Sequence, residues 1–217
     1  MDQKLLFFIN REWTGPALDR LMALLSSFAA WTPLVVVAIV WALWRGGFRA
    51  RAFVLTAGLV VGICDGLIAK NLKRAADRPR PHQVLEGIRL VDLAKATPRM
   101  LAVTKPVKVK LSQPKEDLQN IDGRSFPSSH TMNTISVALV AACFYRRWGW
   151  LAFVPALLVG YSRVYTGSHW PSDILTSTFL GLGVTLLIVA ILEMLWRRHS
   201  ARFFPQLQAA HPSLFTP

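Results

Sequence analysis

The sequence predicts an all-α fold, a polytopic bundle of membrane-spanning helices. Of the 217 residues, 53% are hydrophobic, and they are gathered in long runs. Four runs contain no charged residue, and a fifth contains Asp65 alone: 21–44, 131–145, 148–162 and 174–192, then 52–69. A spanning helix needs about 20 largely apolar residues. The sequence therefore predicts five spans, of which the three middle ones include flanking residues, and five such runs in so short a chain argue against buried helices of a soluble protein.

The N-terminal residues predict an amphipathic helix that lies at the membrane surface. Residues 5–9 are apolar, and a polar stretch with Gly15-Pro16 follows them. So short an apolar stretch is typical of an interfacial segment, which we place at 1–20. Ser26 and Ser27 interrupt the next run. Residues 21–30 therefore begin the first span or form a re-entrant segment, and a sixth span within residues 1–30 stays open.

The predicted membrane domain covers residues 21–202. Its one long polar insertion, 74–125, joins the second span to the third and is rich in Pro, Lys and Asp. Because this extracytoplasmic loop begins and ends at residues of the candidate site, we expect it to cap the site. Residues 203–217 are expected to form a cytoplasmic tail.

The basic residues predict the topology. The formal net charge is +13, but the basic residues bracket apolar runs and form no single basic face, which excludes a nucleic-acid-binding protein. Three links, here called the Arg-rich links, carry Arg45, Arg49 and Arg51, then Arg146 and Arg147, and finally Arg197, Arg198 and Arg202. Such links stay in the cytoplasm. Cys64 and Cys143 lie inside apolar runs and predict no disulfide framework and no thiol metal site.

Other polar residues lie at the opposite ends of the predicted spans. They are Lys73 and Arg80 after the second span, His130 at the start of the third, Arg163 and His169 after the fourth, and Asp173 at the start of the fifth. Since the spans alternate in direction, all six fall on one side. The sequence predicts a site on the non-cytoplasmic face.

These residue types fit phosphoryl transfer. A phosphomonoester dianion needs positive charge and N–H donors around its oxygens, a nucleophile and a proton for the leaving oxygen. Three cations are predicted to bind phosphate: Lys73, Arg80 and Arg163. The N–H groups near Ser128 and Ser129 lie at a predicted helix N-terminus, which favours an anion. Asp173, four residues after His169, can orient its imidazole.

Some neighbouring residues have open or supporting roles. Asp65 is a carboxylate inside a span, so we expect it to support Lys73 or to hydrogen-bond between helices. Ser162 and Ser128 are expected to bind phosphate or to brace the arginines. Arg78 is predicted to be an interfacial anchor.

Three motifs occur in order: Lys-x6-Arg-Pro, Pro-Ser-x-His and Ser-Arg-x5-His-x3-Asp. They span residues 73–173. With them the chain resembles the type 2 phosphatidic acid phosphatase superfamily of integral-membrane lipid phosphatases. Ser129 stands where that family more often has Gly. Because Ser is also small, we expect the backbone path to be preserved.

The resemblance implies a mechanism. His169 attacks phosphorus and forms a phosphohistidine, while Asp173 holds its other ring nitrogen. His130 protonates the departing oxygen and then activates water. Neither a metal nor a cofactor is implied, because Lys73, Arg80 and Arg163 supply the positive charge.

The predicted function is a lipid phosphatase of a bacterial inner membrane, with its active site facing the periplasm. The resemblance implies a phospholipid, a polyprenyl pyrophosphate or lipid A as substrate. A lipid-to-lipid phosphotransferase that uses the same histidine is the alternative. Vanadate-dependent haloperoxidases share the pocket but are soluble, and a transporter or scaffold would leave the histidines unused. The lipid and the oligomeric state stay open.

Overall fold

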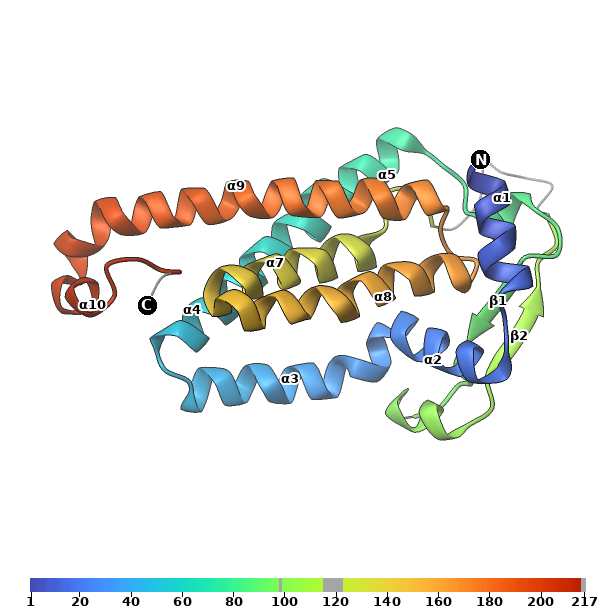
Figure 1. Ribbon diagram of the computed structural model, residues 1–217, viewed down its shortest axis with the longest axis horizontal. Coiled ribbons are helices and arrows are strands. Elements are labelled where there is room, and N and C mark those ends of the chain that lie inside the picture. The colour runs from blue at the N-terminus through green and yellow to red at the C-terminus, as the bar shows by residue number, and fades with distance from the viewer. Residues whose placement is uncertain (98, 115–122, 216–217) are drawn as a thin grey trace.

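The computed structural model describes residues 1–97, 99–114 and 123–215, and the fold is a bundle of long helices (Figure 1). The all-α prediction is confirmed. Among the described residues, four stretches are long and apolar enough to cross a membrane: Phe28–Arg45, Phe48–Val84, Ser129–Tyr165 and Pro171–Phe203. They contain the helices α3 (Phe28–Arg45), α4 (Phe48–Val61), α7 (Ser129–Gly149), α8 (Phe153–Tyr165) and α9 (Pro171–Phe203). The number of membrane crossings stays a prediction.

The stretch Ser129–Tyr165 is folded back on itself. Arg146, inside α7, has backbone angles of φ 52° and ψ −130°, which are not helical. The short helix η4 (Trp150–Ala152) follows and leads into α8. Helices α7 and α8 therefore lie side by side in opposite directions (Figure 1). Two separate helices were predicted here.

The second long stretch changes from an α-helix to a wider π-helix in the segment that contains Asp65. Helix α4 continues into η2 (Gly62–Ala69), which is π-helical, and then into α5 (Lys70–Ala76). Such wide turns occur often at functional sites. Asp77 ends α5 in the left-handed region, at φ 44°, and the short helix α6 (Pro81–Val84) begins four residues later.

The structure divides the first apolar run at the serines that interrupt it. The N-terminal segment forms α1 (Asp2–Phe7), the π-helical turn η1 (Phe8–Glu12) and α2 (Pro16–Ser26). Ser27 breaks the helix at φ −93° and ψ 86°, so the continuous apolar helix begins at Phe28 and not at residue 21. The reason is packing: α2 lies against α8 and the strand β1.

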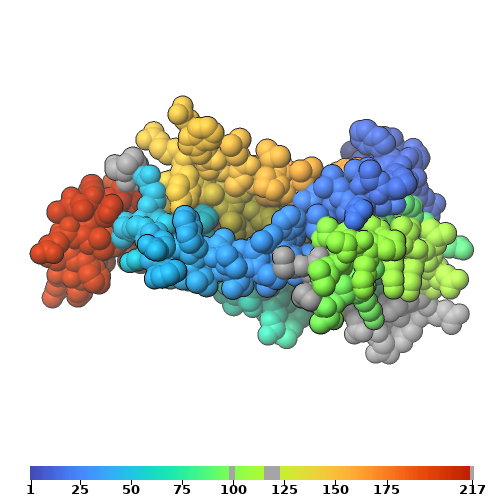
Figure 2. Space-filling view, turned by 90° about the horizontal axis from the view of Figure 1, so that it is seen from below, coloured from blue at the N-terminus to red at the C-terminus, as the bar shows by residue number. Residues whose placement is uncertain are grey.

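Residues 81–97 and 99–114 of the long loop cover the end of the bundle, and we call them the cap. It contains α6 and the antiparallel strands β1 (Arg89–Asp92) and β2 (Lys108–Leu111), with η3 (Arg99–Thr104) between the strands. Val91 and Leu93 of the cap pack with Met22 and Tyr165. Residues 115–122 of the predicted loop lie outside the described residues. Figure 2 shows the cap (green) beside the N-terminal segment (blue).

Helix α7 lies at the centre of the bundle and packs against α4 and α9. Met132, Val140 and Phe144 belong to the core there. Gly181 of α9 allows a close approach, since a Cβ at this position would lie 2.8 Å from the Met132 carbonyl oxygen. This contact sets the N-terminal ends of α7 and α9 beside each other.

The two ends of the bundle differ in composition. The three motifs gather at the end that carries α1 and the cap, and the Arg-rich links lie at the other end (Figure 1). The C-terminal residues, with α10 (Pro205–Ala210), fold back onto α9 at that second end. The indole N–H of Trp196 donates to the His211 carbonyl at 2.9 Å, and the rings of Phe215 and Phe144 meet edge to face.

Candidate active site

His169 lies in a tight turn between α8 and α9. The N–H groups of Ser168 and His169 both donate to the carbonyl of Arg163, at 3.0 and 3.1 Å. Gly167 has φ +70°, and a Cβ there would lie 2.6 Å from Ile88 Cγ2, so the turn requires glycine. The turn carries His169 into the interior, where it is 3% exposed.

Asp173 lies in the first turn of α9 and is fully buried. Its Oδ2 accepts from the Trp170 N–H at 3.0 Å and from the Ser125 hydroxyl. Its Oδ1 accepts from Arg78 Nη1 at 2.7 Å. Oδ2 also lies 3.6 Å from His169 Nδ1. That separation is longer than a hydrogen bond, so the pair is in electrostatic contact.

The imidazole of His169 is held in its neutral form. Burial is the largest cause that lowers its pKa to about 4, Asp173 opposes the shift, and Arg163 and Arg80 add to it. At pH 7 the ring is uncharged and keeps the lone pair that a nucleophile needs. With the proton assigned to Nδ1, which faces Asp173, the lone pair is on Nε2.

Two of the predicted cations, Arg80 and Arg163, act electrostatically on His169, and the third, Lys73, acts on His130. Lys73 Nζ donates to Ser129 Oγ at 2.9 Å. Arg163 Nη1 donates to the carbonyl of Ser26 at 3.3 Å and to its hydroxyl. The Nε groups of Arg80 and Arg163 are buried and have no hydrogen-bond partner among the described residues. Buried, unpaired guanidinium donors favour the binding of an anion.

His130 lies in the first turn of α7 and joins the second motif to the other two. It interacts electrostatically with Arg163, His169, Lys73 and Asp65. The structure therefore brings both predicted histidines into one charged cluster. Asp65, on η2, also interacts with Lys73. This is consistent with a supporting role, which stays a prediction.

The serines before the two motif helices are used by the fold itself. The Ser128 hydroxyl caps α7 by accepting from the Thr131 N–H, and the Ser128 N–H donates to Ser177 Oγ at 2.8 Å. The Ser162 hydroxyl donates to the carbonyl of Val159 at 2.7 Å. Both serines shape their helices, and their contact with phosphate stays a prediction.

Four residues that hold this site together were not predicted from the sequence: Arg78, Ser125, Asp2 and Ser26. Arg78 was assigned to the membrane interface, whereas its guanidinium is paired with Asp173 and Asp2. Its place within the first motif was the available signal. Asp2 and Ser26 carry no local signal, because their partners lie 76 and 137 residues away.

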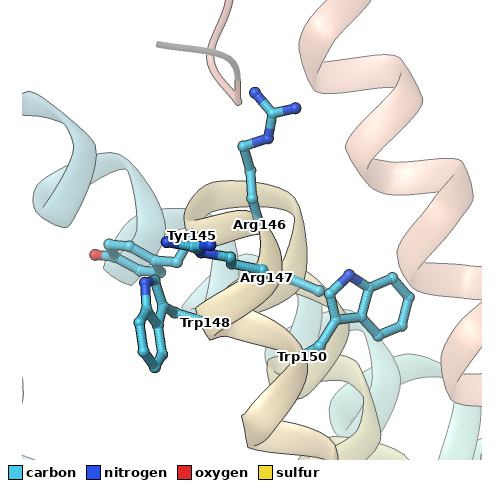
Figure 3. A pocket seen from close by; sticks show the side chains of 6 residues that line it. Tyr145, Arg146, Arg147, Trp148 and Trp150 are labelled. Atoms are coloured by element: carbon cyan, nitrogen blue, oxygen red, sulfur yellow. The ribbon is translucent and has the colours of Figure 1, made fainter.

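A separate depression of about 700 Å³ lies at the turn between α7 and α8. It is lined by Ala142, Tyr145, Arg146, Arg147, Trp148 and Trp150. Figure 3 shows that Arg146 extends away from Trp148 and Trp150, so these groups do not converge on one ligand. Arg and Trp are typical of a membrane–water interface. The depression is at the opposite end from the motifs (Figure 1) and is not part of the candidate site.

Comparison with known proteins gives the same family as the motifs. Residues 51–197 match the model of the PAP2 superfamily. An undecaprenyl-diphosphatase of Sulfolobus acidocaldarius is 38% identical over 68 residues, which cover 31% of this chain and 33% of that protein. Phosphatidylglycerophosphatase B of Escherichia coli K12 is 31% identical over 156 residues, or 64% of this chain and 61% of that protein. The matches thus span less than two thirds of these relatives.

The fold is similar to that of a solved structure. The crystal structure of LpxE from Aquifex aeolicus superposes with a TM-score of 0.60 at 21% identity, over 87% of this chain and 94% of that one. At this identity the similarity concerns the fold alone.

Proposed function

Because the chain belongs to the PAP2 superfamily, we propose that it is a metal-independent lipid phosphatase. It hydrolyses a phosphate monoester or pyrophosphate of a membrane lipid through a phosphohistidine. One observation carries this proposal: the neutral, buried His169 lies against Asp173 and within electrostatic reach of Arg163 and Arg80.

The phosphate is bound by charge and by directed donors. Lys73, Arg80 and Arg163 neutralise its oxygens, and the buried Nε groups of the two arginines gain partners. The first N–H groups of α7, at Ser129 and His130, add an anion-binding helix N-terminus. Binding relieves the repulsion among these cations, which interact with one another in the free site.

The reaction proceeds in two displacements. Nε2 of His169 attacks phosphorus, the bond from phosphorus to the lipid oxygen breaks, and His130 gives that oxygen a proton. His130 then takes a proton from water, whose oxygen attacks phosphorus and breaks the P–N bond. Asp173 stabilises the positive charge that His169 gains in the first step and loses in the second.

The substrate is proposed to be a lipid with an exposed phosphate or pyrophosphate. The names of the relatives support this class, since they include an undecaprenyl-diphosphatase and a phosphatidylglycerophosphatase. The site is proposed to face the non-cytoplasmic side of the inner membrane. The position of the Arg-rich links at the opposite end of the bundle supports this orientation.

Phosphate release from a panel of lipids tests the proposal. The panel contains undecaprenyl pyrophosphate, phosphatidylglycerophosphate, phosphatidic acid and lipid A, offered to purified protein in detergent. We expect release from at least one lipid by wild type and by His199→Ala, a control at an exposed histidine of α9, and none by His169→Ala. Release by folded His169→Ala would exclude the nucleophile. Phosphate that appears on an acceptor lipid instead of in water would establish the phosphotransferase.

A further inference from the structure

We propose that Arg78, held by Asp2 of α1, is a positioning residue that fixes the orientation and the effective charge of Asp173. It acts through Asp173 on His169 and does not contact the substrate. The proposal rests on the proposed function, because it assigns Arg78 and Asp2 to the support of the nucleophile.

The guanidinium of Arg78 has partners at both ends of its fork. Nη1 donates to Asp173 Oδ1 at 2.7 Å and to the Ser172 hydroxyl at 2.9 Å. Nη2 donates to Asp2 Oδ2 at 2.8 Å. The guanidinium carbon also lies 5.2 Å from the centre of the Trp170 ring. A planar fork with both ends engaged is fixed in direction, so Arg78 is directed at the protein and away from a bound phosphate.

Asp2 is itself held to the start of α9. Its Oδ1 accepts from the Ser172 N–H at 2.9 Å, and its Oδ2 accepts from the Ser172 hydroxyl at 2.6 Å. Helix α1 is thereby attached to the helix turn that contains Asp173, and Figure 1 shows α1 across that end of the bundle. The N-terminal helix thus forms part of the support of the site.

The consequence for Asp173 is a carboxylate that cannot rotate. Arg78 occupies Oδ1, while Ser125 and the Trp170 N–H occupy Oδ2, the oxygen that faces His169. Asp2 has a second effect, since its negative charge offsets part of the charge of Arg78. Asp173 therefore keeps enough negative charge to stabilise the imidazole of His169 when that ring becomes positively charged.

Removing Arg78 and removing Asp2 should shift the pKa of His169 in opposite directions. Without Arg78, Asp173 acts more strongly on the imidazole and raises its pKa. Without Asp2, the charge of Arg78 is uncompensated and lowers it. The other charged groups that act on this ring, Arg163 and Arg80 as well as His130, are unchanged in both variants.

The first measurement needs no substrate. The protein is labelled with ¹³Cε1-histidine and titrated by NMR in detergent micelles, and His169 is assigned by its missing signal in His169→Ala. We expect the pKa of His169 to rise in Arg78→Gln and to fall in Asp2→Asn. The pKa of His169 should stay the same in Arg74→Gln and in Glu12→Gln. These variants remove an exposed charge from the first motif and from the N-terminal segment, respectively. Shifts in the same direction, or none, would overturn the proposal.

The second measurement separates positioning from substrate contact. With ³²P-labelled phosphatidic acid in micelles, the rate constant of phosphoenzyme formation is taken from the burst, whose amplitude counts folded sites. Arg78→Gln should lower this rate constant by about 10- to 100-fold, the cost of a displaced reacting group, with KM within about twofold. Arg78→Lys keeps the charge without the fork and should lie between. A raised KM with an unchanged rate constant of phosphoenzyme formation would make Arg78 a substrate contact and overturn the proposal.

The two measurements distinguish this proposal from the proposed function. If wild type forms no phosphohistidine but the two pKa shifts are opposite, the proposed function fails and the positioning of Asp173 stands. If the phosphohistidine forms and Arg78→Gln leaves both its rate and the His169 pKa unchanged, the positioning role fails alone.

Discussion

The neutral state of His169 predicts a specific loss of stability in mild acid. The ordinary pKa of this group is 6.5, and burial lowers it to about 4 in the fold. Between these values the unfolded chain binds a proton that the folded chain does not bind, so stability is lost as the pH falls from 6.5 toward 4 and is fully present above 6.5. At pH 4.5 the loss amounts to roughly 2 to 3 kcal/mol.

The assay compares wild type with His169→Gln, which removes the titrating group and keeps a polar side chain. Unfolding is followed in detergent at pH values from 7.5 to 4.5, with His199→Gln as the control at an exposed histidine. Wild type and the control should lose about 2 to 3 kcal/mol more than His169→Gln over this range. Parallel curves for wild type and His169→Gln would refute the argument that His169 is buried in the neutral form.

Three further predictions concern packing, phosphate binding and the metal-independent mechanism. Gly181→Val should lower stability by about 1 to 3 kcal/mol, because its Cβ would lie 2.8 Å from the Met132 carbonyl oxygen. Gly183→Val, which has nothing within 4 Å of its Cβ, should change the melting temperature little, and equal losses would contradict the proposed helix contact. Ser26→Ala removes the hydroxyl that holds Arg163 and should raise KM by roughly tenfold, with Ser27→Ala as the control. An unchanged KM would mean that Ser26 does not set the position of Arg163. Vanadate should inhibit phosphate release as a mimic of the five-coordinate phosphorus and EDTA should not, so inhibition by EDTA would contradict the metal-independent mechanism.

The sequence was informative about this site because its signals are local. Each motif lies at the end of an apolar run, and alternating helices carry such ends to one side. Lys73, His130 and His169 are predicted in this way at one end of the bundle, and in the structure His130 interacts electrostatically with the other two. For residues 21–30 the sequence left two alternatives open, and the structure ends one helix at Ser26 and begins the next at Phe28.

The sequence by itself determined the fold class, the helices that can enter a membrane and the end of the bundle at which the motif residues meet. These properties follow from hydropathy and from the ends of helices, which are read over some 20 residues. Only the tertiary structure decided the partners of those residues. Arg78 pairs with Asp173 across 95 residues and with Asp2 across 76. Such pairs depend on how α1, α5 and α9 pack. A local sequence pattern does not show which distant segments will be in contact.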